Sequence, residues 1–127
     1  MKLRIYRNSL RLRITQPDME RLIDSGRIEG MIYFAADDKA RLVYALRHEA
    51  TLPNPALIYD SSTVEVALPT HITRDWAETQ QIGIYFTVDL GVRGVLSLMV
   101  EKDFACLDPG GDEIEGAFPN PNIGAAC

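Results

Sequence analysis

Apolar and polar residues alternate along most of the chain, which is the pattern of β-strands with one buried face. The alternation is strict at 2–6 and 10–14, and the segments 27–34 and 41–48 are longer and more apolar. The remaining segments of this kind are 57–60, 64–68, 82–88 and 95–102. The pattern therefore predicts eight strands.

Two other segments repeat their apolar residues at helical spacing. The first follows Thr15, which has an acid three residues later as in a capping box, and Gly26 is a stop signal. The second places Trp76 on its apolar face. We expect helices over 16–25 and 70–79, both short enough to depend on docking against a sheet.

When the chain is aligned with itself so that 1–49 falls on 55–103, the two halves agree in the order and phase of these elements. The alignment needs no gap, and it places Leu22 on Trp76. Three aligned pairs are identical, so the comparison depends on matched pattern rather than on identity. It predicts a duplicated strand–strand–helix–strand–strand (ββαββ) unit. The alternative is that any two small α+β halves can be slid into rough agreement.

These elements predict an α+β fold with a largely antiparallel sheet and two short helices packed outside, in a single domain, 1–127. The doubled unit leaves open whether the strands form an open sheet or a closed eight-stranded barrel. The segment 106–127 is rich in Gly, Pro and acids and is expected to be an irregular acidic tail. The residues predicted to be buried are Leu12, Ile14, Leu22, Ile28, Ile32, Leu46, Val66, Trp76, Ile82, Phe86, Leu98 and Val100.

Composition narrows the class of protein. The chain has 127 residues, of which 46% are hydrophobic, enough for one domain with its own core. Its formal net charge is −5, and a binder of duplex nucleic acid usually has a basic excess, so no duplex nucleic-acid partner is expected. No apolar run approaches the roughly 18 residues of a membrane span, and no signal-peptide core is present, so no membrane association is expected. Cys106 and Cys127 form a poor disulfide framework, which favours a cytoplasmic protein.

The charge is unevenly distributed along the chain. Residues 1–49 hold ten Lys and Arg against seven Asp and Glu, whereas residues 50–127 hold three against eleven. Five bases and no acid lie within the first thirteen residues, and five acids and no base lie within 103–115. The first hairpin therefore carries a local excess of positive charge although the chain as a whole is acidic.

That hairpin gathers its bases on one face. If Asn8–Ser9 forms a two-residue turn, Arg4 lies directly opposite Arg13, where like charges destabilise a sheet. Bulk water, acids of the same chain or a bound phosphate or carboxylate are able to offset this repulsion. By the same register, the equivalent hairpin places Asp60 opposite Glu65. The candidate ligand-binding residues are Lys2, Arg4, Arg11 and Arg13.

No pattern specifies a metal, a cofactor or a catalytic group. The cysteines, His48 and His71 lack the spacing of a metal site, and the acids of 103–115 do not match a calcium loop. The chain has no phosphate-binding glycine loop and no nucleophile elbow. We therefore expect no metal and no cofactor, assign no catalytic residue, and leave open whether the protein is an enzyme.

Three segments resemble a small bacterial family of uncharacterised proteins: 8–13 (Asn-Ser-Leu-Arg-Leu-Arg), 100–107 (Val-Glu-Lys-Asp-Phe-Ala-Cys-Leu) and 118–121 (Phe-Pro-Asn-Pro). The resemblance covers the whole chain and implies no activity. The predicted architecture also resembles the triphosphate tunnel (CYTH-like) fold, in which the strands close into a wide barrel with charged side chains inside. That family carries Glu-x-Glu-x-Lys on its first strand, whereas residues 2–6 here read Lys-Leu-Arg-Ile-Tyr, so no catalytic residue is carried over.

Two interpretations of function follow. The first is a non-enzymatic binding or interaction module whose ligand and protein partner are unidentified. The alternative is a binder or hydrolase of small anionic, phosphorylated ligands inside a CYTH-like barrel. An enzyme site requires Arg4, Arg11 and Arg13 to converge in a cavity with an acid or base, whereas an interaction module leaves them on an open surface.

Overall fold

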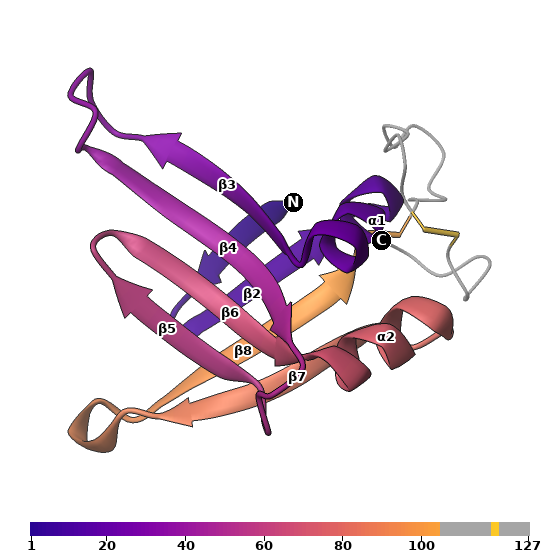
Figure 1. Cartoon of the computed structure of the whole chain (residues 1–127). Helices are drawn as coiled ribbons and strands as arrows, with labels where there is room; N and C mark the ends of the chain where they lie inside the picture. Colours follow the sequence, from indigo (N-terminus) through magenta and orange to yellow (C-terminus); the bar gives the residue numbers. More distant parts are fainter. Residues whose placement is uncertain (105–117, 120–127) are drawn as a thin grey trace, which may run out of the picture.

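The computed structural model describes residues 1–104 and 118–119 as an α+β fold with two helices and two four-stranded sheets (Figure 1). Sheet A has the strand order β1 (Lys2–Tyr6), β2 (Ser9–Ile14), β8 (Val95–Lys102) and β7 (Gly83–Asp89). Sheet B has the order β3 (Arg27–Tyr33), β4 (Arg41–Glu49), β6 (Thr63–Pro69) and β5 (Ala56–Asp60). The helices are α1 (Gln16–Ser25) and α2 (Thr70–Glu78), and a 3-10 turn, η1 (Gly91–Arg93), lies between β7 and β8.

Each sheet joins two antiparallel hairpins through one parallel pair of strands. In sheet A, β2 runs parallel to β8, and in sheet B, β4 runs parallel to β6. The hairpins β1–β2, β3–β4, β5–β6 and β7–β8 are antiparallel. The prediction of an α+β fold with two helices is confirmed, and the sheets are mixed rather than one largely antiparallel sheet.

The strands do not close into a barrel within the described chain. Sheet A ends at β1 and β7, sheet B ends at β3 and β5, and no strand pairing joins the two sheets. Of the two arrangements that the sequence left open, the closed eight-stranded barrel is therefore wrong. Alternation specifies which face of a strand is buried, but it carries no information about which strands pair.

The two halves of the chain have the same order of elements. The strands β1 and β5 begin at Lys2 and Ala56, which the alignment of 1–49 on 55–103 makes equivalent. The strand β3 begins at Arg27, which the alignment places on position 81. The strand β7 begins two residues later, at Gly83, because the connection after α2 is longer than the one after α1. A shorter loop between β7 and β8 restores the agreement, so that β8 begins at the equivalent of the start of β4. Duplication of an ancestral unit remains a prediction that this agreement motivates.

The core lies between the two sheets and the helices, which sit together at one end of the molecule (Figure 1). Trp76 is fully buried, and nine of the twelve predicted core residues are buried. Phe86 is half-buried. Ile32 and Ile82, exposed by 48% and 42%, were wrongly predicted. Ile82 precedes β7, so Ile84 occupies the buried position instead, and Ile32 lies towards the projecting tip of the β3–β4 hairpin (Figure 1).

Helix α1 begins and ends as predicted. In its capping box, Asp18 N–H donates to Thr15 Oγ1 (3.4 Å) and Thr15 N–H donates to Asp18 Oδ2 (3.0 Å), and Gly26 closes the helix in the left-handed region at φ 84°. Asp18 also contacts Arg21 and the Met1 amine. Burial opposes ionisation of the Asp18 carboxyl, but the hydrogen bond from Thr15 and the amine outweigh it, so the pKa of Asp18 is lowered.

Two basic side chains, at equivalent positions of the two halves, bind the carboxyl ends of the helices. His48 Nε2 donates to Leu22 O in α1 (3.1 Å), and its Nδ1 forms a hydrogen bond with Thr70 Oγ1 (2.9 Å). Lys102 Nζ donates to Thr79 O at the end of α2 (2.7 Å), and burial lowers the pKa of Lys102. Cationic or donating groups favour this end of a helix because its carbonyls are unpaired.

Some predictions concern residues that the structure does not describe. Those for Cys106 and Cys127, and for nearly all of the acidic tail 106–127, lie outside the described residues. Phe118 is described, and it joins Phe104 through a parallel bridge with the two ring centroids 6.1 Å apart. Among the described helices, none is long and apolar enough to cross a membrane.

Candidate functional site

The first hairpin turns one residue earlier than predicted. Its turn residues are Arg7 and Asn8, with Tyr6 opposite Ser9, and Arg7 adopts the left-handed region at φ 50°. Asn8 Nδ2 donates to the carbonyl oxygen of Val95 in β8 (2.7 Å), which holds the turn against the neighbouring strand. This tertiary contact stabilises the observed turn, and it is not part of the local turn preference on which the prediction depended.

The corrected register changes the partners of the four predicted ligand-binding residues. Arg4 lies opposite Arg11 rather than Arg13, and Lys2 lies opposite Arg13. The register moves by two residues, so each side chain keeps its face of the strand. The structure therefore brings Lys2, Arg4, Arg11 and Arg13 together on the outer face of sheet A, as expected.

Acids of the same chain neutralise two of these bases. Lys2 Nζ lies 3.1 Å from Asp103 Oδ2, and Arg11 Nε lies 2.9 Å from Glu101 Oε1. Both contacts are ion pairs by distance, although neither has the angles of a hydrogen bond. Arg4 and Arg13 form no ion pair with any residue in the described part of the chain, so their charges face solvent.

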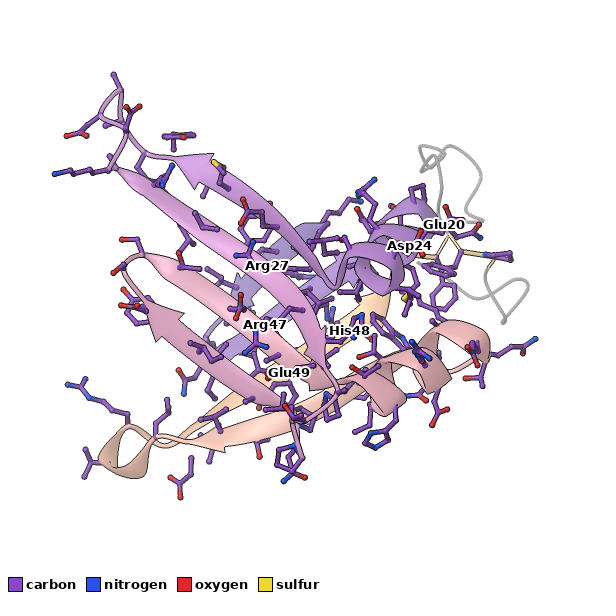
Figure 2. All side chains as sticks on the ribbon, viewed as in Figure 1. Glu20, Asp24, Arg27, Arg47, His48 and Glu49 are labelled. Atoms are coloured by element: carbon purple, nitrogen blue, oxygen red, sulfur yellow. The ribbon has the colours of Figure 1, made fainter. Side chains whose placement is uncertain are left out.

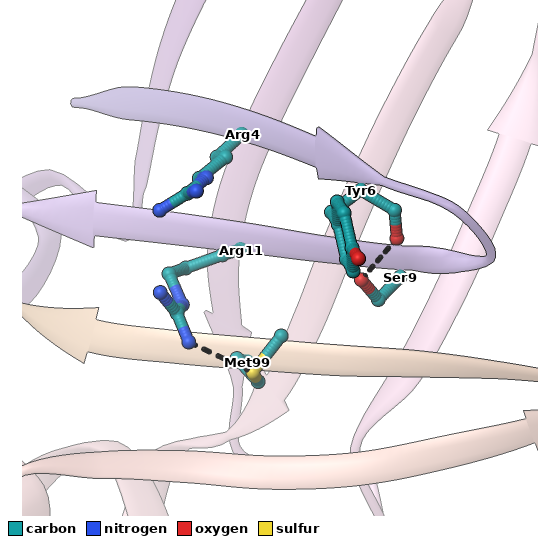
Figure 3. A pocket seen from close by; sticks show the side chains of 5 residues that line it. All are labelled: Arg4, Tyr6, Ser9, Arg11 and Met99. Atoms are coloured by element: carbon teal, nitrogen blue, oxygen red, sulfur yellow. Dashed lines mark hydrogen bonds between the residues drawn. The ribbon is translucent and has the colours of Figure 1, made fainter.

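A cavity of about 190 Å³ opens on this face beside Arg4 (Figure 3). Figure 3 shows the Arg4 and Arg11 side chains extending from neighbouring strands in the same direction, with the Tyr6 ring standing farther along the hairpin. Arg11 Nη2 contacts Met99 Sδ (3.5 Å), and Ser9 Oγ donates to Tyr6 O (2.5 Å). These five side chains line the cavity.

The strand registers place the site in a row that crosses sheet A. Arg4 in β1 pairs with Arg11 in β2, Arg11 with Met99 in β8, and Met99 with Tyr85 in β7. Glu101, two residues after Met99 in β8, contacts two members of this row. Tyr85 Oη donates to Glu101 Oε2 (2.9 Å), and Arg11 contacts the other carboxylate oxygen. Burial and the bond to Glu101 raise the pKa of Tyr85. Glu101 therefore holds Arg11 in place, and Arg4 is the one charge of the row without an ion-pair partner among the described residues.

Sheet B carries an equivalent ion pair with the charges exchanged. Glu65 occupies the position equivalent to Arg11, and Arg47 the position equivalent to Glu101. Arg47 Nε donates to Glu65 Oε1 (2.6 Å). Arg27 Nε donates to the other oxygen of Glu65 (3.0 Å), and Figure 2 shows Arg27 and Arg47 on the same face. Each of these arginines also has a second acid, Glu29 for Arg27 and Glu49 for Arg47.

These two arginines of sheet B are therefore both paired with acids, whereas Arg4 and Arg13 of sheet A have no ion-pair partner among the described residues. Burial raises the pKa of Glu65, but hydrogen bonds from Arg27 and Arg47 outweigh it and lower that pKa, and the bonds to Glu65 raise the pKa of both arginines. The predicted opposition of Asp60 to Glu65 is wrong, since Ile58 is the residue opposite Glu65. This face of sheet B thus offers no comparable excess of positive charge among the described residues.

Sequence reasoning identified the bases of the site but not the residues around them. Tyr6 and Ser9 belong to the same hairpin, but the sequence predicts Ser9 in the turn, whereas β2 begins at this residue. Met99, Glu101 and Tyr85 come from β7 and β8, and their place depends on the parallel pairing of β2 with β8. The comparison of the two halves held a signal for Glu101. It places Arg47 on Glu101 and Arg11 on Glu65, so each half has one arginine where the other has a glutamate.

The described residues show no cluster of three or more His, Cys, Asp or Glu side chains able to hold a metal ion. Searches of curated proteins and of solved structures found no match for the chain. The sequence does match one protein family over nearly its whole length, and the family's description gives no activity. On that match, which spans residues 1–122, the chain belongs to the family of unknown function DUF7009.

Proposed function

We propose that this protein is a binding module that takes an anionic group, a phosphate or a carboxylate, on the outer face of β1 and β2. One observation carries the proposal: Arg4 faces Arg11 beside a cavity, and Arg4 has no acidic partner in the described chain. Like charges placed opposite one another destabilise a strand pair, and a bound anion relieves that cost. A hydrolase within a barrel is not proposed, because the strands form two separate sheets.

The chemistry of the site suits a charged oxygen ligand. The guanidinium of Arg4 presents a planar set of donors that matches phosphate or carboxylate in two-point contact. Arg11, held by Glu101 and Met99, supplies a second positive group in a fixed place. The cavity of about 190 Å³ is smaller than the roughly 300 Å³ at which sites for whole drug-sized ligands begin. It therefore suits one anionic group of a ligand whose remainder lies across the sheet.

The proposal is tested by thermal unfolding in phosphate, sulfate and pyrophosphate, against chloride at equal ionic strength. At a ligand concentration one hundred times Kd, binding to the native state adds about 2.7 kcal/mol of stability and raises Tm. The variant Arg4→Gln should lose most of this increase. The control Arg74→Gln, an exposed arginine of α2, should keep it. An equal rise of Tm for the parent and Arg4→Gln would contradict the proposal.

A further inference from the structure

The outer face of sheet A presents aromatic rings as well as positive charge. Tyr6 in β1 is 62% exposed and Tyr85 in β7 is 57% exposed. Tyr6 follows Arg4 by two residues on the same face, and Tyr85 ends the row that starts at Arg4. Tyr6 therefore lies beside Arg4 along β1, and Tyr85 lies two strands beyond Arg11 on the same face.

The geometry points to a single-stranded nucleic acid as the ligand, with bases stacked on Tyr6 and Tyr85 and phosphates held by Arg4 and Arg11. This inference rests on the proposed function, because the phosphate contacts are those of the anion site. It adds the two tyrosines as the residues that recognise bases.

The dimensions of the face agree with such a ligand. Adjacent strands lie about 4.8 Å apart, so the row from Arg4 to Tyr85 spans about 14 Å. A four-stranded sheet with aromatic side chains on its open face accommodates two or three unpaired bases. Every base has a flat face that stacks on an aromatic ring, and arginine fits the phosphates between them. The Arg7 guanidinium, 5.5 Å from the centroid of the Tyr6 ring, adds a further positive group at that end.

The charge of this face also complements a polyanion, despite the net charge of −5 for the chain. Arg4 and Arg13 are unpaired among the described residues. On sheet B, Glu65 pairs with both Arg27 and Arg47, and each of these arginines has one further acid. Duplex nucleic acid keeps its bases stacked inside the helix, so the tyrosines could not reach them. The site is thus specific for unpaired strands.

The test is fluorescence anisotropy with a fluorescein-labelled ten-residue oligouridylate, alongside a duplex of the same length and linear inorganic polyphosphate. The variants Tyr6→Leu and Tyr85→Leu should each weaken oligouridylate binding by at least about fivefold, because stacking on an aromatic ring is lost. They should weaken polyphosphate binding less than oligouridylate binding, because the phosphate contacts of Arg4 and Arg11 do not require an aromatic ring. Tyr59→Leu, which removes a tyrosine 71% exposed on β5, should bind like the parent. Tyr85→Phe, which keeps the ring but loses the hydroxyl that donates to Glu101, should bind oligouridylate more tightly than Tyr85→Leu.

The variant Arg4→Gln separates the contribution of positive charge from that of base stacking. This variant should weaken both oligouridylate and polyphosphate, and it should reduce the slope of log K against log salt for the oligonucleotide by about 0.7. If both tyrosine variants bind oligouridylate like the parent while Arg4→Gln weakens both ligands, base stacking is refuted and the anion site stands. If Arg4→Gln weakens neither ligand, the proposed function is refuted as well. Equal affinity for duplex and single strand would also overturn the inference.

Discussion

Replacing Glu101 with Gln removes the negative charge that holds Arg11, while it keeps the size of the side chain and an oxygen for Tyr85. In the parent, Arg11 Nε lies 2.9 Å from Glu101 Oε1, and the two side chains are 28% and 16% exposed. Tyr85 Oη donates to the other carboxylate oxygen (2.9 Å) and is able to donate to the amide oxygen of Gln. The substitution therefore isolates the charge of Glu101.

The expected cost follows from the partial burial of this pair. Exposed ion pairs contribute about 0–1 kcal/mol, whereas removing one partner of a buried pair costs about 3–5 kcal/mol. The Arg11–Glu101 contact lies between these limits and lacks the angles of a hydrogen bond, so Glu101→Gln should lower the free energy of unfolding by about 1–2 kcal/mol. The same change leaves both Arg4 and Arg11 uncompensated, and it should raise the affinity of the site for anions.

Urea unfolding of Glu101→Gln in chloride and in sulfate measures both effects. The variant should lose stability in chloride and recover more of it in sulfate than the parent gains. Glu78→Gln, which removes an exposed acid at the end of α2, is the matched control and should change neither value. A variant as stable as the parent, or one that sulfate stabilises no more than the parent, would refute the reasoning.

Three other substitutions or conditions test the rest of the structure. Trp76→Ala should cost about 3–5 kcal/mol, because the buried indole also donates to Ile82 O (3.1 Å), and a loss below about 1 kcal/mol in urea unfolding would contradict its place in the core. Ser62→Gly should add about 0.5–1 kcal/mol in thermal unfolding, because Ser62 sits at φ 63°, where the penalty for a non-glycine residue exceeds the entropy that glycine loses, and a lower Tm would contradict this. The lowered pKa of Asp18 stabilises the fold above its unfolded value of about 3.9, and this contribution is lost as pH falls through the folded pKa. Acid unfolding of Asp18→Asn should therefore depend less steeply on pH below about 4, and a curve parallel to that of the parent would contradict the assignment.

Local patterns predicted the elements and their buried faces because these depend on nearby residues. The capping box at Thr15 and the stop at Gly26 bounded α1, and strict alternation placed the bases of β1 and β2 on one face. The turn of the first hairpin was predicted one residue too late, which shifts the strand register by two residues. A shift of two residues leaves every side chain on the same face, so the predicted basic face is still correct.

Contacts between distant strands could not be predicted in the same way. The pairing of β2 with β8 joins residues such as Arg11 and Met99, which are 88 apart in the chain, and no local preference encodes it. For the same reason, the sequence could not exclude a closed barrel, and it did not predict that Met99, Glu101 and Tyr85 lie beside the bases of the first hairpin. The ungapped comparison of the halves also missed the longer connection after α2 and the shorter loop between β7 and β8. It therefore predicted that Ile82 is buried, whereas Ile84 is the buried residue.

Binding of an anion to the outer face of β1 and β2 is tested by a ¹H–¹⁵N NMR titration with pyrophosphate, which reports on each strand separately. The hairpin β5–β6 is an internal control, because it has the same form but carries Ile58 and Glu65 where the first hairpin has Arg4 and Arg11. The account predicts saturable shifts of the amides in 2–6 and 9–14, with those of β5 and β6 unchanged. The absence of a saturable shift, or equal shifts in the two hairpins, would contradict it.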